Sequence, residues 1–267
     1  MIHHPPVVLT IAGSDCSAGA GIQVDLKTFS AFGCYGMSAL TCIVAEVPGQ
    51  VLSIQAVSND LVRDQIVLLF DTFSIAAIKT GMLFSKSIIK TVAEVFDQLP
   101  QLPPLVVDPV LVASSGDPLL EPDAIEAYRE ELFPMATLIT PNLDELYCLA
   151  SVTKRPSSLD EMKDVGHELL SRVKRSLLLK GGHLQGTTAT DLLLLQDESE
   201  HYFSSPFLRN AETHGTGCTY AAAITAALGK GKSLPDAVAI AKNFVTEAIA
   251  HAYRWNQISV LNIPSSV

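Results

Sequence analysis

The sequence predicts an α/β fold in which helices cover both faces of a central, mostly parallel sheet, and three observations lead to this expectation. Short runs rich in Val, Ile, Leu and Thr alternate with longer amphipathic segments. The chain has 267 residues, of which 48% are hydrophobic and 17% charged, enough to bury a large core within one α/β domain. Glycine-rich or polar segments follow most of the apolar runs, as ligand-binding loops do at the carboxyl ends of parallel strands.

The alternation of apolar runs and amphipathic segments assigns most of the first 180 residues to strands and helices. The expected strands are 7–12, 38–44, 75–80, 105–109, 137–140 and 176–180. The expected helices are 19–32, 60–72, 85–98, 122–133, 142–150 and 159–173. A strand, a helix and a further strand in this order form a crossover unit, which places the strands in parallel.

The last third of the chain departs from this alternation. Residues 191–196 and 201–205 flank a short polar loop and predict a hairpin. Residues 219–228 favour a helix that stops at Gly229. A second helix is expected from the capping-box spacing at 233–236 to about Tyr253. Because the sequence shows no repeat, low-complexity tract or long linker, we expect a single domain over residues 1–267.

The composition of the chain limits which classes of function and which cellular compartment we expect. The formal net charge is −10 and the isoelectric point is about 5.1, which argues against a nucleic-acid-binding surface. The five cysteines are odd in number and form no Cys-x-x-Cys pair, so neither a disulfide framework nor a zinc site is expected. No apolar run approaches the ~20 residues of a membrane helix, and residues 1–12 do not resemble a signal peptide. We therefore expect a soluble, cytoplasmic protein without a membrane partner.

The most informative stretch is His214-Gly215-Thr216-Gly217-Cys218, which immediately precedes the expected helix 219–228. A helix N-terminus carries free N–H groups and partial positive charge, and glycines there let an anionic oxygen approach the main chain. The same field lowers the pKa of a thiol, which makes Cys218 a candidate base or nucleophile. The stretch also fits a glycine-rich loop that enters a core helix carrying a buried cysteine.

Other strand ends carry the groups that phosphoryl transfer needs. Asn142 and Glu145, three residues apart at a helix start, could hold Mg²⁺ through water, although they also fit an ordinary N-cap with a first-turn Glu. Lys180, before two glycines, could reach a phosphate, or it could simply be a solvated strand end. Asp108 would place a carboxylate near the metal or the phosphates, unless it is only a turn residue before Pro109.

The ends of the first three expected strands indicate a pocket for the acceptor molecule. Glu46 follows an apolar run, so its carboxylate is expected to be partly buried. Burying an unpaired carboxylate costs free energy, and an N–H group of a ligand would offset that cost. Alternatively, the Glu46 side chain turns into solvent. Met82 is more often a core residue, but Gly81 would bring its backbone close to a ligand. Residues 13–21 lack the spacing of a Walker loop and are expected to wrap the acceptor.

Taken together, these motifs resemble the hydroxymethylpyrimidine and phosphomethylpyrimidine kinases of thiamin synthesis, within the ribokinase-like superfamily. The resemblance runs in order over about residues 7–250. Its pieces are 9–15, 19–23, 25–29, 79–83, 115–120, 139–143, 180–183 and 214–218. It departs from the usual pattern at Ala18, where the family has glycine, and this change removes no functional group.

The resemblance implies a ribokinase-like fold, commonly dimeric, that uses ATP and Mg²⁺ to phosphorylate a pyrimidine alcohol and then its monophosphate. The active-site cysteine of the family falls on Cys218, with Gly215, Thr216 and Gly217 forming the anion hole. The pyrimidine-recognising side chain falls on Glu46, which suits an aminopyrimidine because the NH₂ group is a donor.

The remaining site residues follow from the same resemblance. Those expected to line the acceptor pocket are Gly13, Asp25, Val44 and Met82. Those expected around the nucleotide and the metal are Asp108, Asn142, Glu145, Lys180 and, for adenine, Val245.

Three alternatives remain open from the sequence. Close relatives phosphorylate pyridoxal, but they carry an apolar residue in place of the carboxylate of Glu46. The fold could also be repurposed, for example as an ADP-forming hydratase. A module that only binds a thiamin precursor or a nucleotide is a third possibility, and it would show ligand-dependent thermal stabilisation without turnover.

Overall fold

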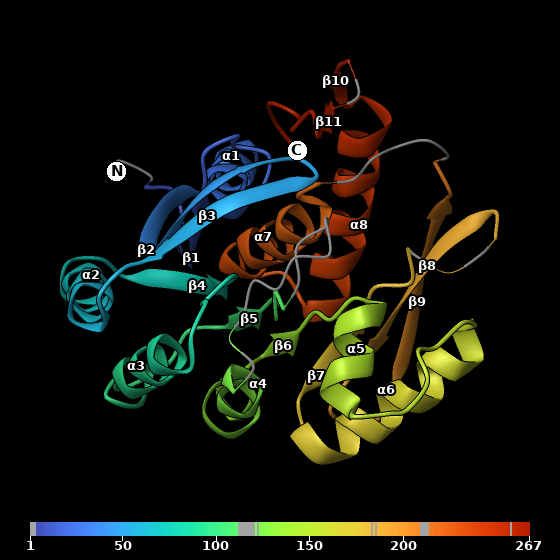
Figure 1. Cartoon of the computed structure of the whole chain (residues 1–267), viewed down its shortest axis with the longest axis horizontal. Helices are drawn as coiled ribbons and strands as arrows, with labels where there is room; N and C mark the ends of the chain where they lie inside the picture. Colours follow the sequence, from blue (N-terminus) through green and yellow to red (C-terminus); the bar gives the residue numbers. More distant parts are fainter. Residues whose placement is uncertain are drawn as a thin grey trace.

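A nine-stranded sheet organises the chain in the computed structural model, which describes residues 4–111, 121, 123–182, 184, 186–208, 214–256 and 258–267 (Figure 1). The strand order is β3-β2-β1-β4-β5-β6-β7-β8-β9. The strands are β1 (Val7–Asp15), β2 (Tyr35–Val47), β3 (Gln50–Ala56), β4 (Ile75–Thr80), β5 (Leu105–Val107), β6 (Leu138–Ile139), β7 (Ser176–Leu179), β8 (Thr188–Leu194) and β9 (Glu200–Pro206). The six strands from β2 to β7 in the sheet order are parallel, whereas β3 and β8 run antiparallel to their inner neighbours.

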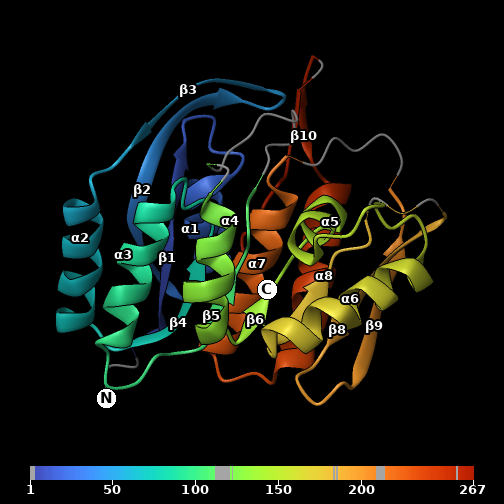
Figure 2. The ribbon, with the colours of Figure 1, turned by 60° about the horizontal axis from the view of Figure 1, so that its bottom comes forward.

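Helices cover both faces of this sheet, which confirms the predicted fold class (Figure 2). On one face lie α2 (Asn59–Thr72), α3 (Lys86–Asp97), α4 (Ala124–Ala127), α5 (Leu143–Ala150) and α6 (Leu159–Val173). On the other face lie α1 (Gly21–Ala31), α7 (Thr216–Gly229) and α8 (Leu234–Ala250). Each face has its own apolar cluster, and the strands contribute alternate side chains to the two. None of the described helices is long and apolar enough to cross a membrane.

The helix α7 is apolar on nearly all sides because it packs between the sheet and α8. Residues 219–227 are buried, and α7 contacts β1, β4 and β5 as well as α8. Its N-terminus therefore lies at a fixed place above the centre of the sheet, among the carboxyl ends of the parallel strands (Figure 2).

The sequence did not predict the hairpin of β2 and β3. The second strand extends to Val47, and the two-residue turn Pro48-Gly49 leads into β3, with Gly49 at a φ of +84°. Most side chains of β3 are exposed or half-buried, so its alternation of apolar and polar residues is weak. Glu46 consequently lies within β2 rather than after a strand, and a bulge between Ala45 and Glu46 shifts the pairing there.

Other elements also differ from their predicted bounds, and three of them show why. The helix expected at 122–133 is α-helical only over 124–127, and a π-helical turn and a 3₁₀ turn follow, at a point where Pro134 cannot donate a backbone hydrogen bond. The strand β5 ends two residues early, before Asp108 and Pro109. Helix α8 ends at Ala250, and Tyr253 begins a small ribbon of β10 (Tyr253–Trp255) and β11 (Ile258–Val260).

Candidate active site

A cavity of about 1110 Å³ opens at the carboxyl ends of the parallel strands and gathers the residues that the sequence singled out. Its volume suits two small ligands rather than one. The predicted site residues that line it are Gly13, Val44, Glu46, Met82, Asp108, Asn142, Glu145, Lys180, Gly215, Thr216, Gly217, Cys218 and Val245. Of the predicted set, Asp25 does not line the cavity.

The turn before α7 needs glycine for steric reasons. Gly215 has a φ of +81°, and a Cβ there would lie 1.8 Å from the carbonyl oxygen of Gly19. In return, a Cβ on Gly19 would lie 2.7 Å from the His214 ring. The first N–H groups of α7 come from Thr216, Gly217 and Cys218, which have no carbonyl one turn earlier in the helix. The turn can therefore present main-chain donors to an anion, as predicted.

Cys218 lies at this N-terminus, but its thiol is not acidic. The side chain keeps some exposed surface in the cavity, and its sulfur receives the N–H of Gly21 at the start of α1. Burial is the largest effect and raises the pKa of the thiol to about 11, against the opposing charge of Lys79. The expected low thiol pKa is thus wrong, because loss of hydration outweighs the effects of Lys79 and the Gly21 N–H.

On the α7 side of the cavity, Lys180 pairs with two carboxylates. Its Nζ lies 2.8 Å from Asp108 Oδ1 and 4.0 Å from Glu145 Oε2, and the Thr140 hydroxyl donates to Asp108 at 2.9 Å. A Cβ on Gly217 would be 3.3 Å from Lys180 Nζ, so the anion-binding turn lies directly against this ammonium group. Burial alone would raise the pKa of Asp108, but Lys180 and Lys79 hold it below its usual range.

Asn142 and Glu145 form a capping box at the start of α5. The Asn142 side chain accepts the N–H groups of Asp144 and Glu145 at 2.9 Å, and Glu145 Oε2 accepts the Asn142 N–H at 2.7 Å. The N-cap interpretation of this pair is therefore correct. Because the Asn142 oxygen already has two donors, it is a poor metal ligand. Burial raises the pKa of Glu145 to about 7, so its carboxyl group gains or loses a proton near neutral pH.

The opposite side of the cavity is apolar. Cys42, Val44 and Met82 form a small buried cluster, and the Thr41 hydroxyl donates to the Met82 carbonyl at 2.6 Å. Gly13 lies at a break in the β1–β2 register, and a Cβ there would be 2.7 Å from the Cys42 sulfur. The missing side chain at Gly13 therefore makes room for the Cys42 sulfur.

Glu46 is the charged group in this apolar half, and it has a perturbed pKa. Burial, reinforced by the nearby Asp15, raises the pKa of Glu46 to about 6, while His214 opposes the shift. Asp15 itself is fixed by hydrogen bonds from the backbone of Ser17, Gly19 and Ala20. The His214 ring lies 3.1 Å from Asp15 and so joins the turn before α7 to the loop after β1.

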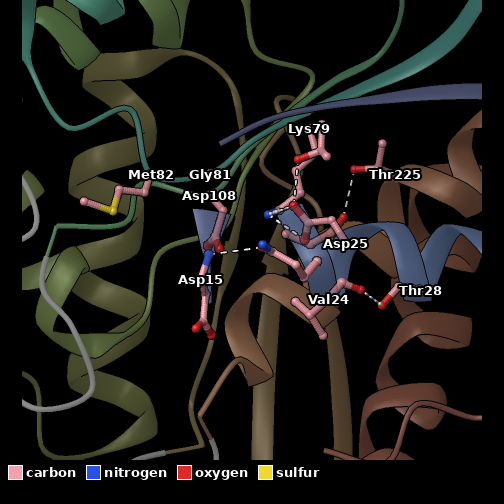
Figure 3. Close-up of polar contacts among 12 residues, drawn as sticks. Asp15, Val24, Asp25, Thr28, Lys79, Gly81, Met82, Asp108 and Thr225 are labelled. Atoms are coloured by element: carbon pink, nitrogen blue, oxygen red, sulfur yellow. Dashed lines mark hydrogen bonds and ion pairs between the residues drawn. The ribbon is translucent and has the colours of Figure 1, made fainter. Parts of the chain in front are cut away.

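Asp25 does not belong to the acceptor pocket, contrary to the prediction. It is fully buried and faces Lys79, whose Nζ lies 2.9 and 2.8 Å from its two carboxylate oxygens (Figure 3). Thr10 donates to the same carboxylate at 2.6 Å. Lys79 lines the cavity wall instead, and the sequence analysis did not single it out. A lysine inside the otherwise apolar run 75–80 was the signal that could have found it.

The far end of the cavity has mixed character. Val245 lines it from α8 together with Tyr220 and Ile249. The neighbouring Lys242 forms a buried ion pair with Asp191 at 2.7 Å. Residues 115–120 and 183, which carry part of the resemblance, lie outside the described residues.

Comparisons with known proteins agree with this geometry. The family model described as phosphomethylpyrimidine kinase matches residues 15–261. A hydroxymethylpyrimidine/phosphomethylpyrimidine kinase of Streptomyces coelicolor is 44% identical over 249 residues, which is 93% of this chain and 90% of that protein. The protein of the same name from Escherichia coli is 41% identical, with 91% of each chain covered.

Solved structures show the same fold. An ADP complex of Bacillus subtilis pyridoxal kinase has a TM-score of 0.88 at 36% identity, with 97% of each chain covered. A phosphomethylpyrimidine kinase from Clostridium difficile has a TM-score of 0.79 at 38% identity, covering 91% of this chain and 99% of that one. The fold and site thus define a ribokinase-like small-molecule phosphotransferase. Within that class, the chain belongs to the phosphomethylpyrimidine kinase family.

Proposed function

We propose that the protein transfers a phosphoryl group from ATP to 4-amino-5-hydroxymethyl-2-methylpyrimidine, and then to the resulting monophosphate, in thiamin biosynthesis. The observation that carries this proposal is the placement of Glu46, a carboxylate in an otherwise apolar wall that lies in the same cavity as Cys218 and Lys180. An aminopyrimidine offers an NH₂ donor to that carboxylate and a flat apolar ring to Val44 and Met82.

The geometry supports separate roles for Cys218, for the main-chain N–H groups and for Lys180 at the point of phosphoryl transfer. The acceptor hydroxymethyl group would lie between Cys218 and the terminal phosphate of ATP. The N–H groups of residues 216–218 and the ammonium of Lys180 would stabilise the transferred charge. With a pKa of about 11, the Cys218 thiol is protonated near neutral pH. It must lose this proton before it can take one from the acceptor hydroxyl.

The donor set also fits Mg²⁺. Asp108 and Glu145 bring two buried carboxylates close to Lys180, and Mg²⁺ bound with a nucleotide commonly uses one or two carboxylates plus phosphate oxygens. The described residues contain no group of three or more His, Cys, Asp and Glu side chains placed to hold a metal by themselves. Mg²⁺ would thus arrive with ATP, be held by Asp108 and Glu145, and neutralise phosphate charge.

Pyridoxal is the second candidate acceptor. The structural likeness to the pyridoxal kinase from Bacillus subtilis favours it, as does the likeness to that from Staphylococcus aureus, which has a TM-score of 0.87 in a complex with an ATP analogue and pyridoxal. Against it stands the Glu46 carboxylate, which the apolar part of a pyridoxal ring would leave without a donor.

A direct assay separates these candidates. The protein is incubated with ATP, Mg²⁺ and each acceptor, and phosphorus NMR follows the products. We expect a monophosphate and then a diphosphate of the pyrimidine, with slower turnover of pyridoxal. Nucleotide hydrolysis without a phosphorylated acceptor would contradict the proposal. Cys218→Ala should reduce turnover ~10²-fold to 10³-fold, whereas undiminished turnover would reject the role of the thiol but not the kinase.

The setting of the enzyme is also part of the proposal. We infer that the protein works in the cytoplasm as a homodimer, without a nucleic-acid or membrane partner. The reduced state of its cysteines supports the compartment, since the structure has Cys16, Cys34, Cys42, Cys148 and Cys218 as free thiols. Sedimentation of the purified protein tests the dimer.

A further inference from the structure

A buried ion pair lies beneath the proposed transfer point and has no role in the function derived so far. The Lys79 ammonium, at the end of β4, is held by both oxygens of Asp25 on α1, and both side chains are 0% exposed (Figure 3). Two of the three N–H donors of the ammonium are used by this one carboxylate. The pair is therefore a fixed charge with a defined position.

Stability alone is a poor reason for such a pair. Removing two charges from water costs several kcal/mol per ion, and well-packed apolar residues of similar volume often serve a core as well or better. Apart from Thr10, whose hydroxyl donates to Asp25, and Thr80, the buried residues of β1 and β4 near the pair are apolar, so an apolar pair would suit most of this layer of the core. The location of Lys79 points to another role.

Lys79 reaches the wall of the cavity from behind. Its Nζ lies 3.1 Å from the place that a Cβ on Gly81 would occupy, and Lys79 contributes to the lining of the cavity. At 0% exposure the ammonium is nevertheless beyond the reach of a water-sized group. Lys79 must therefore act on the cavity through its charge rather than by touching a ligand.

This charge acts on Cys218, which lines the same cavity. Its sulfur takes the Gly21 N–H at the start of α1, so two helix N-termini, of α1 and α7, meet at the thiol. Charged groups face it from four other segments. They are Lys79 on β4, Asp25 on α1, Asp108 after β5 and Lys180 after β7. Of these, Lys79 favours a negative sulfur most strongly, whereas the two carboxylates oppose it.

We propose that Lys79 and Asp25 are positioning residues of the transfer site: the fixed ammonium stabilises negative charge on Cys218, while Asp25 holds that ammonium in place and moderates its field. The acceptor hydroxyl would lose its proton to the sulfur, whose negative form this charge favours. The kinetic consequence rests on the proposed function, but the effect of the pair on the sulfur does not.

Three variants test the inference. Lys79→Met removes the positive charge, Asp25→Asn removes the negative one, and the double variant removes both while keeping the volume. The single variants break a buried ion pair, so both should lower the melting temperature. The double variant should melt close to the wild type, because it leaves no buried charge without a partner. It therefore keeps the test valid if a single variant folds poorly.

The readout is the rate at which iodoacetamide alkylates Cys218, followed by peptide mass spectrometry at a series of pH values without any substrate. The exposed Cys16 in the same sample is the internal control. We expect the alkylation rate of Cys218 near neutral pH to fall roughly 10-fold or more in Lys79→Met and in the double variant, because less of the sulfur is in the thiolate form. The rate should rise in Asp25→Asn, since the ammonium then acts unopposed.

A merely structural pair would give a different pattern. Unchanged profiles, or shifts of both single variants in the same direction, would overturn the inference. Turnover supplies a second readout, and the double variant should lose ~10²-fold in kcat with a much smaller change in the nucleotide KM. Wild-type kcat in a folded double variant would likewise overturn it. If the wild type phosphorylates no acceptor, the proposed function fails, but opposite shifts at Cys218 would still support the pair.

Discussion

The two halves of the cavity are built on opposite principles. The acceptor half, from the ends of β1, β2 and β4, is a close-packed apolar wall in which Gly13 makes room for Cys42 and Glu46 is the lone carboxylate of the predicted set. The phosphate half, from the ends of β5, β6 and β7, holds Lys180 between Asp108 and Glu145. The acceptor half therefore presents an apolar surface with a single charge. The phosphate half presents several charged groups that already hold one another in place.

This difference shows how one sheet edge can bind two unlike ligands. Polyanionic phosphates are recognised by charge, and a pre-formed network needs no reorganisation when they bind. A small flat ring has little charge, so contact area and one well-placed acceptor must distinguish it. We therefore expect substitutions in one half to affect mainly one ligand, and the following predictions test that separation.

The largest effect is expected at Lys180. Lys180→Met removes the ammonium between Asp108 and Glu145 and leaves two buried carboxylates without their shared partner. We predict a loss of ~10³-fold in kcat/KM for ATP with the acceptor KM nearly unchanged, measured by steady-state kinetics. Lys232→Met, at an exposed position, is the matched control and should leave both parameters alone. A larger change in the acceptor KM than in the ATP parameters would break the comparison.

Glu46 should give the converse result. Glu46→Leu keeps an apolar wall but removes the acceptor of the pyrimidine NH₂ group, so the pyrimidine KM should rise by about 10-fold to 100-fold and the ATP KM should stay within about twofold. Glu46→Gln, which retains a carbonyl acceptor, should fall between Leu and wild type. Equal increases in both KM values would show that Glu46 acts on the fold rather than on the acceptor.

The pH dependence of acceptor binding sharpens the role of the same residue. Burial raises the pKa of Glu46 to about 6, so the carboxylate form, which accepts a hydrogen bond, is lost as the pH falls through that value. The pyrimidine KM should rise about 10-fold between pH 7 and pH 5 in the wild type. Glu46→Gln has no proton to gain and is the control that removes the contribution of the ligand itself. A wild-type profile that matches this variant would mean that Glu46 does not titrate in the site.

The smallest effect is expected at Met82. Met82→Leu conserves volume in the apolar wall, so the pyrimidine KM should change less than about fivefold and the ATP KM not at all. Met37→Leu makes the same exchange in the core, away from the cavity, and measures the cost to stability alone. If Met82→Leu abolished activity while Met37→Leu did not, the wall would be recognising more than shape.

The pattern of apolar residues predicted much of the fold, because strands buried on both faces are continuous apolar runs in the sequence. The runs that became β1, β4 and β7 are almost wholly apolar, and α6 begins and ends at its predicted residues. The strand β3 leaves no such signal, because its side chains lie largely in solvent at the sheet edge. The bulge beside Glu46 depends on the pairing with that strand, so the sequence could not reveal it.

Residue types at the ends of strands predicted much of the site. The prediction was wrong where contacts between residues far apart in the sequence decide the chemistry. Glycines before α7 and the lysine after β7 have positions that a local motif indicates. The pairing of Asp25 with Lys79 joins α1 to β4 across 54 residues, and only the folded chain shows that it turns Asp25 away from the cavity. The thiol pKa failed for a similar reason, because burial is a property of the assembled site.

Binding measured one ligand at a time tests the central claim most directly, since the claim is that the two halves recognise different ligands. Isothermal titration calorimetry would compare Glu46→Leu and Lys180→Met, each with the pyrimidine alcohol alone and with the Mg²⁺ complex of a non-hydrolysable ATP analogue. We predict a crossed pattern, in which Glu46→Leu weakens only the pyrimidine and Lys180→Met weakens only the nucleotide. If either variant weakened both ligands to the same degree, the division of the cavity into two recognition halves would be contradicted.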